Sequence, residues 1–182
     1  RVINPLFMDT LHAEFRAAGK NPAKLEVLQN KISKLKFLDP ACGCGNFLVV
    51  AYRELRLLEL EIIKLRHTDQ IASGQHGFSG TILHYSKLSI EQMHGIEIEE
   101  FPVLIARLAL WLTDHQMNTK LGELFGEYAT RLPLVQGGHI RQANSLQIDW
   151  NEVINKKELS YIFGNPPFLG YKQQNEEQKR DI

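Results

Sequence analysis

The sequence predicts an α/β fold, a mostly parallel sheet with helices on both faces. Short apolar runs that suit buried strands alternate along the chain with longer segments of helical periodicity, and this alternation favours a parallel sheet. The length of 182 residues allows one domain of this kind but not two comfortable ones. With 43% hydrophobic and 23% charged residues, the chain has the composition of a globular protein rather than of a disordered or collagen-like one.

Two helices are predicted before the first strand. Asn4 and Asn21 are each followed by proline, a helix-start signal, and Gly19 is expected to end the first helix. We expect residues 1–36 to form a helical segment that packs on a domain formed by residues 37–182. The positions expected to face the core are Phe7, Leu11, Phe15, Ala18, Leu25, Leu28, Ile32 and Leu35.

The rest of the chain is read as alternating strands and helices. Strands are predicted at residues 37–39, 93–98, 139–143 and 159–164. A long helix is predicted from Asn46 to about residue 66, and a second one begins near Glu99, with residues 67–80 as a loop and 118–138 irregular. The inner stripe expected of that second helix is Phe101, Leu104, Ile105, Leu108 and Leu112.

Composition also restricts the setting in which the chain works. No apolar run approaches the ~20 residues of a membrane span, so we expect no membrane partner. Cys42 and Cys44 are too close for easy pairing or for a four-ligand zinc site, so no metal site and a reducing, cytoplasmic setting are expected. Basic and acidic residues number 21 each, so a dedicated nucleic-acid binder is not indicated. If the chain acts on DNA, most phosphate contacts are expected elsewhere.

The turn after the first predicted strand is the strongest local motif. Asp39 ends the strand, and a turn with Gly43 and Gly45 opens the helix at Asn46, the layout of a nucleotide-binding βα unit. The turn is not a dinucleotide fingerprint, because the third glycine would fall at Leu48, and no Walker sequence follows. From spacing alone, a tight turn without a ligand remains a second interpretation.

Three motifs in order resemble those of S-adenosylmethionine-dependent DNA methyltransferases that modify adenine. The run FLDPACGCGNFL (37–48) looks like motif I, GIEIEEF (95–101) resembles motif II, and NPPF (165–168) matches the catalytic motif IV. With the flanking NPLF (4–7), they resemble the MmeI-like branch of combined restriction–modification enzymes, from about residue 4 to residue 182. The resemblance implies a Rossmann-like methyltransferase fold.

The same resemblance implies a binding site for S-adenosylmethionine. The residues expected around its methionine part are Asp39, Pro40, Ala41, Cys42, Gly43, Gly45, Asn46 and Phe47. Glu97 would accept hydrogen bonds from the ribose hydroxyls, Ile98 would pack on the adenine ring, and Asn144 with Ser145 would meet the adenine edge. Glu97 follows Asp39 by 58 residues rather than the roughly 20 of a minimal unit, and MmeI-like proteins are similar in this respect.

The implied chemistry is methyl transfer to the exocyclic N6 of an adenine flipped out of double-stranded DNA. The Asn165 side chain and the Pro166 backbone offer carbonyl oxygens that can accept hydrogen bonds from the amino group, and Phe168 offers a flat face for stacking. Attack on the sulfonium methyl would be direct, without a covalent enzyme intermediate. The implied catalytic residues are Asn165, Pro166, Pro167 and Phe168.

Other functions stay open at this point. Protein glutamine N5-methyltransferases use a similar motif, although usually with Tyr at the aromatic position, and N4-cytosine methyltransferases more often carry Ser-Pro-Pro. A non-catalytic cofactor-binding fragment is the third alternative. We expect the sheet to be truncated after its fourth strand, so that the later strands and the target-recognition part belong to a longer parent chain. The isolated piece would then bind cofactor weakly and methylate no DNA.

Overall fold

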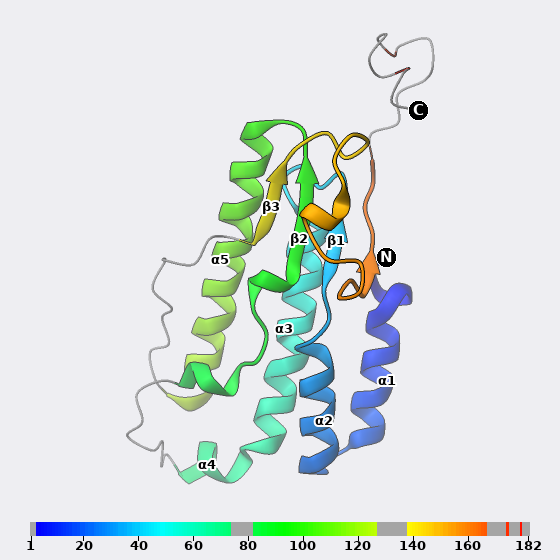
Figure 1. The fold of residues 1–182 in the computed structure, drawn as a ribbon. Coiled ribbons are helices and arrows are strands. Elements are labelled where there is room, and N and C mark those ends of the chain that lie inside the picture. The colour runs from blue at the N-terminus through cyan, green and yellow to red at the C-terminus, as the bar shows by residue number, and fades with distance from the viewer. Residues whose placement is uncertain (1–2, 74–81, 127–137, 167–173, 175–178, 180–182) are drawn as a thin grey trace.

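The chain forms a four-stranded parallel sheet with helices packed against it (Figure 1). The computed structural model describes residues 3–73, 82–126, 138–166, 174 and 179. The strands are β1 (Phe37–Asp39), β2 (Met93–Glu97), β3 (His139–Gln142) and β4 (Tyr161–Ile162), in the order β3-β2-β1-β4. The α/β fold with a parallel sheet is therefore confirmed.

The longer helices lie on one side of the sheet. In chain order the helices are η1 (Asn4–Met8), α1 (Asp9–Ala18), α2 (Pro22–Ile32), α3 (Asn46–Arg66), α4 (Thr68–Ser73), η2 (Ile82–Tyr85), η3 (Ile90–Gln92), α5 (Glu100–Phe125) and η4 (Trp150–Glu152). Side chains of α1, α2, α3 and α5 share one core with strand residues such as Phe37 and Met93. On the other face, Leu38 and Ile96 are covered by Ile154 and by side chains flanking η4. Figure 1 shows η4 in front of the sheet and α3 and α5 behind it.

The two N-terminal helices use the faces that their periodicity predicts. Phe7, Leu11, Leu25, Leu28 and Ile32 are all buried in the main core. Asn21 caps α2, since its side chain accepts a hydrogen bond from the Lys24 backbone N–H at 3.1 Å. Asn4 is not a cap as predicted, because Ile3 is already helical and the first turn is the π-helical segment η1.

Strand β4 is shorter than the predicted run of residues 159–164. The backbone N–H groups of Ser160 and Tyr161 both point at the Lys36 carbonyl, at 2.9 and 3.2 Å, so regular pairing starts only at residue 161. Beyond the strand, the Phe163 N–H still donates to the Leu38 carbonyl at 3.0 Å. The chain therefore follows the edge of β1 to the end of that strand.

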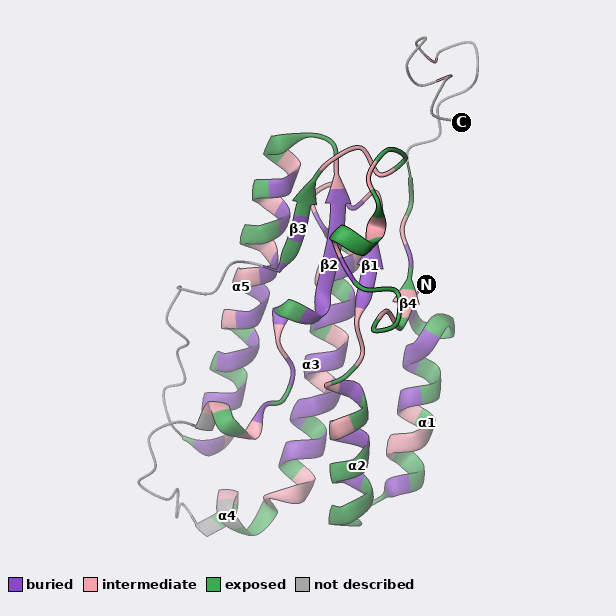
Figure 2. Cartoon of the chain, viewed as in Figure 1, coloured by how far each residue is buried: buried purple, intermediate pink, exposed green. Residues whose placement is uncertain are grey.

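The predicted inner stripe of α5 is wrong. Phe101, Leu104 and Leu108 are 73%, 52% and 55% exposed, whereas Ala106 and Leu110 are fully buried. Figure 2 shows exposed positions along the outer side of α5. The helix carries apolar residues on both faces, and hydrophobic periodicity does not distinguish an inner from an outer face in such a helix.

The helix also continues past residue 118, where an irregular segment was predicted. It runs to Phe125 and includes Gly122, and it ends at Gly126, which adopts a left-handed conformation with φ of 68°. Gly126, not the first glycine of the segment, therefore marks the helix end.

A buried polar network joins α3 to α5. Arg56 is fully buried, and its guanidinium donates hydrogen bonds to Tyr52, Asp114 and Asn118, each at 2.8 Å. The Tyr52 hydroxyl donates to Asp114 at 2.6 Å, and Arg56 also lies 3.4 Å from the carboxylate of Glu59. Charged side chains are rarely buried unless they are paired, so this network shows that neighbouring helices enclose the middle of α3.

No helix among the described residues is both long and apolar enough to cross a membrane.

A matched pair of substitutions tests the orientation of α5. Leu110→Ala removes a side chain from the core and should lower the free energy of unfolding by about 2–5 kcal/mol. Leu108→Ala changes an exposed side chain two residues away and should alter it by no more than about 0.5 kcal/mol. Urea unfolding followed by circular dichroism measures both values. The opposite ranking would support the stripe predicted from the sequence.

Candidate active site

Those motif residues that the structure describes lie at one edge of the sheet. Because β1, β2 and β4 are parallel, their carboxyl ends lie at the same edge, with Asp39 paired in register to Gly95 of β2. The loop after β1, the end of β2 and the segment after β4 therefore become neighbours. This is the edge at which open α/β sheets bind their ligands.

The loop between β1 and α3 is held by backbone contacts. The Cys42 N–H donates to the Ile96 carbonyl at 3.0 Å, which ties the loop to β2, and the Gly45 N–H closes the turn on the Cys42 carbonyl at 2.8 Å. Gly45 has φ of 80°, and a Cβ there would lie 3.0 Å from the Cβ of Ala106. The start of α3 thus packs directly on α5. Gly43 also has a positive φ, but a Cβ there would point into open space.

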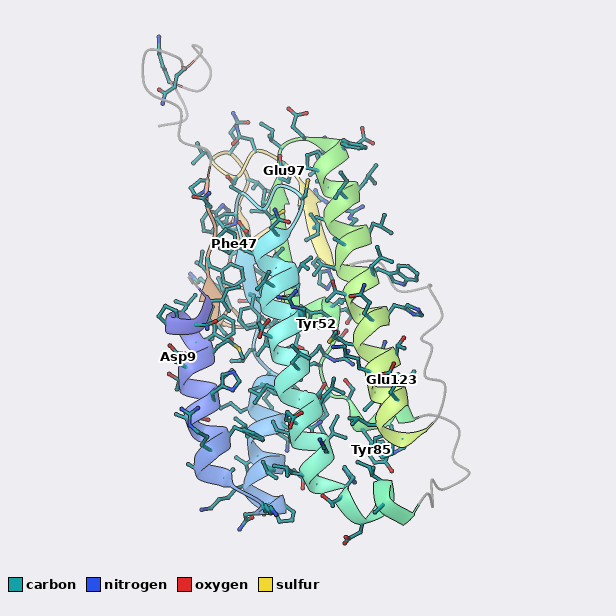
Figure 3. The ribbon with its side chains drawn as sticks, turned by 180° about the vertical axis from the view of Figure 1, so that it is seen from behind. Asp9, Phe47, Tyr52, Tyr85, Glu97 and Glu123 are labelled. Carbon is teal, nitrogen blue, oxygen red and sulfur yellow. The ribbon has the colours of Figure 1, made fainter. Side chains whose placement is uncertain are left out.

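Glu97 links this loop to the end of β2. One carboxylate oxygen accepts a hydrogen bond from the Gly43 N–H at 2.9 Å, and the other accepts from the Glu99 N–H at 3.0 Å. The side chain remains partly exposed, and a carboxylate has about four acceptor positions, so it can accept further hydrogen bonds. In Figure 3, Glu97 lies at the same end of the molecule as Phe47 in the first turn of α3.

Asp39 is buried beneath the loop, with 1% of its surface exposed. Its Oδ1 accepts a hydrogen bond from the Ala41 N–H at 3.1 Å, while Oδ2 is buried and has no hydrogen-bond partner among the described residues. Burial raises the pKa of this carboxyl to about 6 against the opposing effect of the Ala41 N–H, and the nearby Glu97 charge adds to the rise. An unsatisfied carboxylate oxygen in this position suits a ligand that brings a cation or a hydrogen-bond donor.

Asn165 follows the strand that borders Asp39. A Cβ on Gly164 would lie 2.5 Å from Asp39 Oδ1, so the backbone just before Asn165 rests against the Asp39 carboxyl. Asn165 and Pro166 are both exposed at the sheet edge. The predicted Pro167 and Phe168 lie outside the described residues.

The predicted adenine-binding residues Ile98, Asn144 and Ser145 lie just beyond the ends of β2 and β3. Ile98 is 57% exposed beyond the end of β2, and the Ala143 N–H donates to the Glu97 carbonyl at 2.9 Å, which brings Asn144 beside β2. The Asn144 side-chain oxygen accepts from the Leu146 N–H at 3.0 Å, and the Ser145 carbonyl accepts from the Trp150 indole at 2.8 Å. These two residues shape the loop after β3.

The remaining predicted residues of the loop and of the start of α3 differ in how far they are buried. Pro40 and Ala41 are half-buried, whereas Asn46 is exposed at the start of α3. The Phe47 ring lies 6.3 Å from that of Phe163, which links the start of α3 to the β4 side of the sheet.

Cys42 is buried and does not suit nucleophilic chemistry. Burial, with smaller contributions from the charges of Asp39 and Glu97, raises the pKa of its thiol to about 12, so the thiolate is not populated near neutral pH. A Cβ on Gly95 would lie 2.8 Å from its sulfur. Cys42 therefore packs against β2 as a small apolar group.

Two glycines for which the sequence predicts no role complete the site, Gly95 and Gly164. Gly95 makes room for Cys42, and Gly164 makes room for Asp39. The sequence marks these glycines only by their positions, since Gly95 lies within the predicted strand that leads to Glu97 and Gly164 directly precedes Asn165. Their contacts depend on strand order, which the sequence alone does not supply.

The arrangement offers acceptors at two places. Asp39 Oδ2 can receive a cationic group, and the Glu97 carboxylate can accept further hydrogen bonds next to Gly43, where an added Cβ would meet no atom within 4 Å. Two carboxylates with unused acceptor positions therefore lie at the same edge of the sheet.

Comparison with known proteins gives a consistent result. Residues 15–182 match the family model described as MmeI, DNA-methyltransferase domain. The chain is 43% identical to DNA methyltransferase A of Bacillus subtilis, covering 100% of this chain and 20% of that protein. It is 28% identical to a putative type II restriction enzyme and methyltransferase of Methanocaldococcus jannaschii, covering 90% of this chain and 13% of that protein.

A solved structure has the same fold. The Type IIL restriction-modification enzyme MmeI, in complex with DNA, superposes with a TM-score of 0.90 and 49% sequence identity over 99% of this chain. This chain spans 23% of the MmeI chain and a fifth or less of the two relatives.

The buried Asp39 carboxyl predicts a pH-dependent difference in stability. Its pKa rises from 3.8 to about 6 on folding, so the folded state binds the proton more tightly and this carboxyl destabilises the protein as pH rises through that interval. Asp39→Asn cannot ionise and should be more stable than wild type at pH 7, by at most about 3 kcal/mol. The difference should shrink toward pH 4 in urea unfolding measured across this range.

Asp149→Asn is the control for this measurement. Hydrogen bonds from Asn151 lower the pKa of the exposed Asp149, so its replacement should destabilise the protein slightly at neutral pH. If Asp39→Asn also lowered the free energy of unfolding at neutral pH, the conclusion that burial raises the pKa of Asp39 would be wrong.

Proposed function

Since this chain belongs to the MmeI DNA-methyltransferase domain family, we propose that it forms the cofactor-binding and catalytic part of a restriction–modification DNA methyltransferase. The reaction moves the methyl group of S-adenosylmethionine to the exocyclic N6 of an adenine flipped out of double-stranded DNA. The observation that carries this proposal is the juxtaposition of Asp39, Glu97 and the Gly164–Asn165 backbone at one edge of the sheet.

The cofactor is assigned to the loop after β1 and the end of β2. The Asp39 carboxylate, through its unsatisfied Oδ2, would take the amino group of the methionine part, with the loop of residues 40–47 around it. Glu97 would accept hydrogen bonds from the ribose hydroxyls while it keeps the Gly43 N–H. Ile98 would pack on the adenine ring, and Asn144 with Ser145 would border its polar edge. The bound cofactor supplies an activated methyl group on a sulfonium.

The target base is assigned to the segment after β4. The lone pair of an exocyclic amino group is delocalised into the ring, so acceptors for its N–H groups make the nitrogen more nucleophilic. The exposed Asn165 side chain and Pro166 carbonyl supply such acceptors, and proline contributes no competing N–H donor. Phe168 would stack on the base, and Pro167 would keep the turn rigid.

The chemistry requires no covalent enzyme intermediate. Cys42 lies in the cofactor loop, and burial holds its thiol protonated near neutral pH, so direct transfer from sulfonium to nitrogen fits this site better than attack by a thiolate. The side chain that acts on the amino group is therefore Asn165.

The full-length protein that carries this chain provides the direct test. It is incubated with methyl-labelled S-adenosylmethionine and double-stranded DNA, and the DNA is then digested to nucleosides. We expect label in N6-methyladenine. Label in N4-methylcytosine would overturn the choice of base, and label in protein glutamine alone would overturn the choice of DNA.

Asn165→Ala tests the proposed acceptor role. Turnover should fall by about 10²–10³, the usual effect of losing one preorganised hydrogen-bonding group, whereas S-adenosylmethionine affinity should stay within about twofold. Asn155→Ala, at another exposed asparagine, is the control and should leave both values unchanged. Unchanged turnover in the Asn165 variant would remove this residue from the mechanism.

Glu97→Ala tests the ribose assignment. Loss of hydrogen bonds to a charged acceptor should weaken S-adenosylmethionine binding about 10- to 100-fold in calorimetric titration. Glu100→Ala removes an exposed carboxylate in the first turn of α5 and is the matched control. Equal affinities for the two variants would refute the assignment.

A further inference from the structure

Gly164, directly after β4, packs closely against the loop that follows β1. A Cβ at this position would lie 2.5 Å from Asp39 Oδ1, 3.3 Å from Asp39 Cγ and 3.6 Å from Pro40 Cδ. Gly164 is not among the described glycines with positive φ, so the backbone conformation itself does not require glycine. Glycine is required here because the Asp39 carboxyl leaves no room for a side chain.

The Asp39 carboxyl has little room to move aside. It is 1% exposed, and the Ala41 N–H holds its Oδ1 at 3.1 Å. A side chain at residue 164 would therefore displace the carboxyl from the loop or separate the end of β4 from β1. The first movement changes the position of Oδ2, which has no hydrogen-bond partner among the described residues, and the second changes the position of Asn165.

The backbone ladder does not hold Gly164 by itself. Among the described residues, the last backbone hydrogen bond between these two segments joins the Phe163 N–H to the Leu38 carbonyl at 3.0 Å. Gly164 and Asn165 follow directly, and the surface on which Gly164 packs is the Asp39–Pro40 pair. The Asp39 carboxyl thus supports the start of the catalytic turn.

We infer that Gly164 is a positioning residue that couples the two halves of the site, because it seats the turn of Asn165 directly on the carboxyl of Asp39. This inference rests on the proposed function. A cofactor amino group at Oδ2 fixes the carboxyl on which Gly164 packs, and so favours one position of Asn165. By linkage, a base held at Asn165 favours cofactor binding to the same extent.

The first test measures cofactor affinity in the full-length protein without DNA. Gly164→Ala changes a residue assigned to neither ligand, yet it should weaken S-adenosylmethionine binding about tenfold or more by shifting Asp39. Ile162→Ala, at an exposed side chain of the same chain segment, is the control and should stay within about twofold. Equal affinities in Gly164→Ala and Ile162→Ala would overturn the inference.

The second test is a double-mutant cycle on the free energy of unfolding, and it needs no cofactor. Gly164→Ala should destabilise the wild-type protein but have little effect in an Asp39→Ala background, where the carboxyl is absent. An equal loss in both backgrounds would show that Gly164 acts through another contact.

These outcomes are separable from those of the methylation assay. If the full-length protein methylated no DNA while both tests gave the expected results, the proposed reaction would fail and the Asp39–Gly164 contact would stand. If methylation occurred and the cycle showed full additivity, the inference alone would fail.

Discussion

The fold depends on the buried ion pair between Arg56 of α3 and Asp114 of α5. Neither side chain has appreciable access to solvent. Tyr52 and Asn118 each accept a hydrogen bond from Arg56 and donate one to Asp114, so they compensate both charges of the pair. Removing one member of such a pair typically costs about 3–5 kcal/mol, because the remaining charge is left buried and uncompensated. The pair therefore fixes how the two longest helices lie against each other.

That fixed geometry extends to the site. Helix α3 begins where the loop after β1 ends, and α5 begins just after Glu97, so the distance between the helix starts sets the distance between the two loops. Gly45 and Ala106 show how little tolerance remains, since a methyl group would not fit between them without movement. The hydrogen bond from Gly43 to Glu97 then closes the loops on each other.

Much of this arrangement follows from the sequence, and the remainder depends on tertiary contacts. Strand order in the chain, the capped helix α2 and the neighbouring positions of Asp39 and Glu97 were predictable, because strand ends and caps have local signals. The inner face of α5 was not, since it is apolar on both faces. Burial of Arg56 was not predictable either, because its acidic partner Asp114 lies on another helix. Phe168 lies outside the described residues, so its role remains a prediction.

The outer face of α5 has a consequence for how the protein behaves in concentrated solution. Phe101, Leu104, Leu108 and Leu112 place large apolar side chains in water along one side of the helix. The formal net charge is zero and the pI is about 7.2, so long-range repulsion between molecules is weakest near neutral pH. Colloidal stability should therefore be lowest near pH 7, and buffers well away from the pI should keep this chain dispersed.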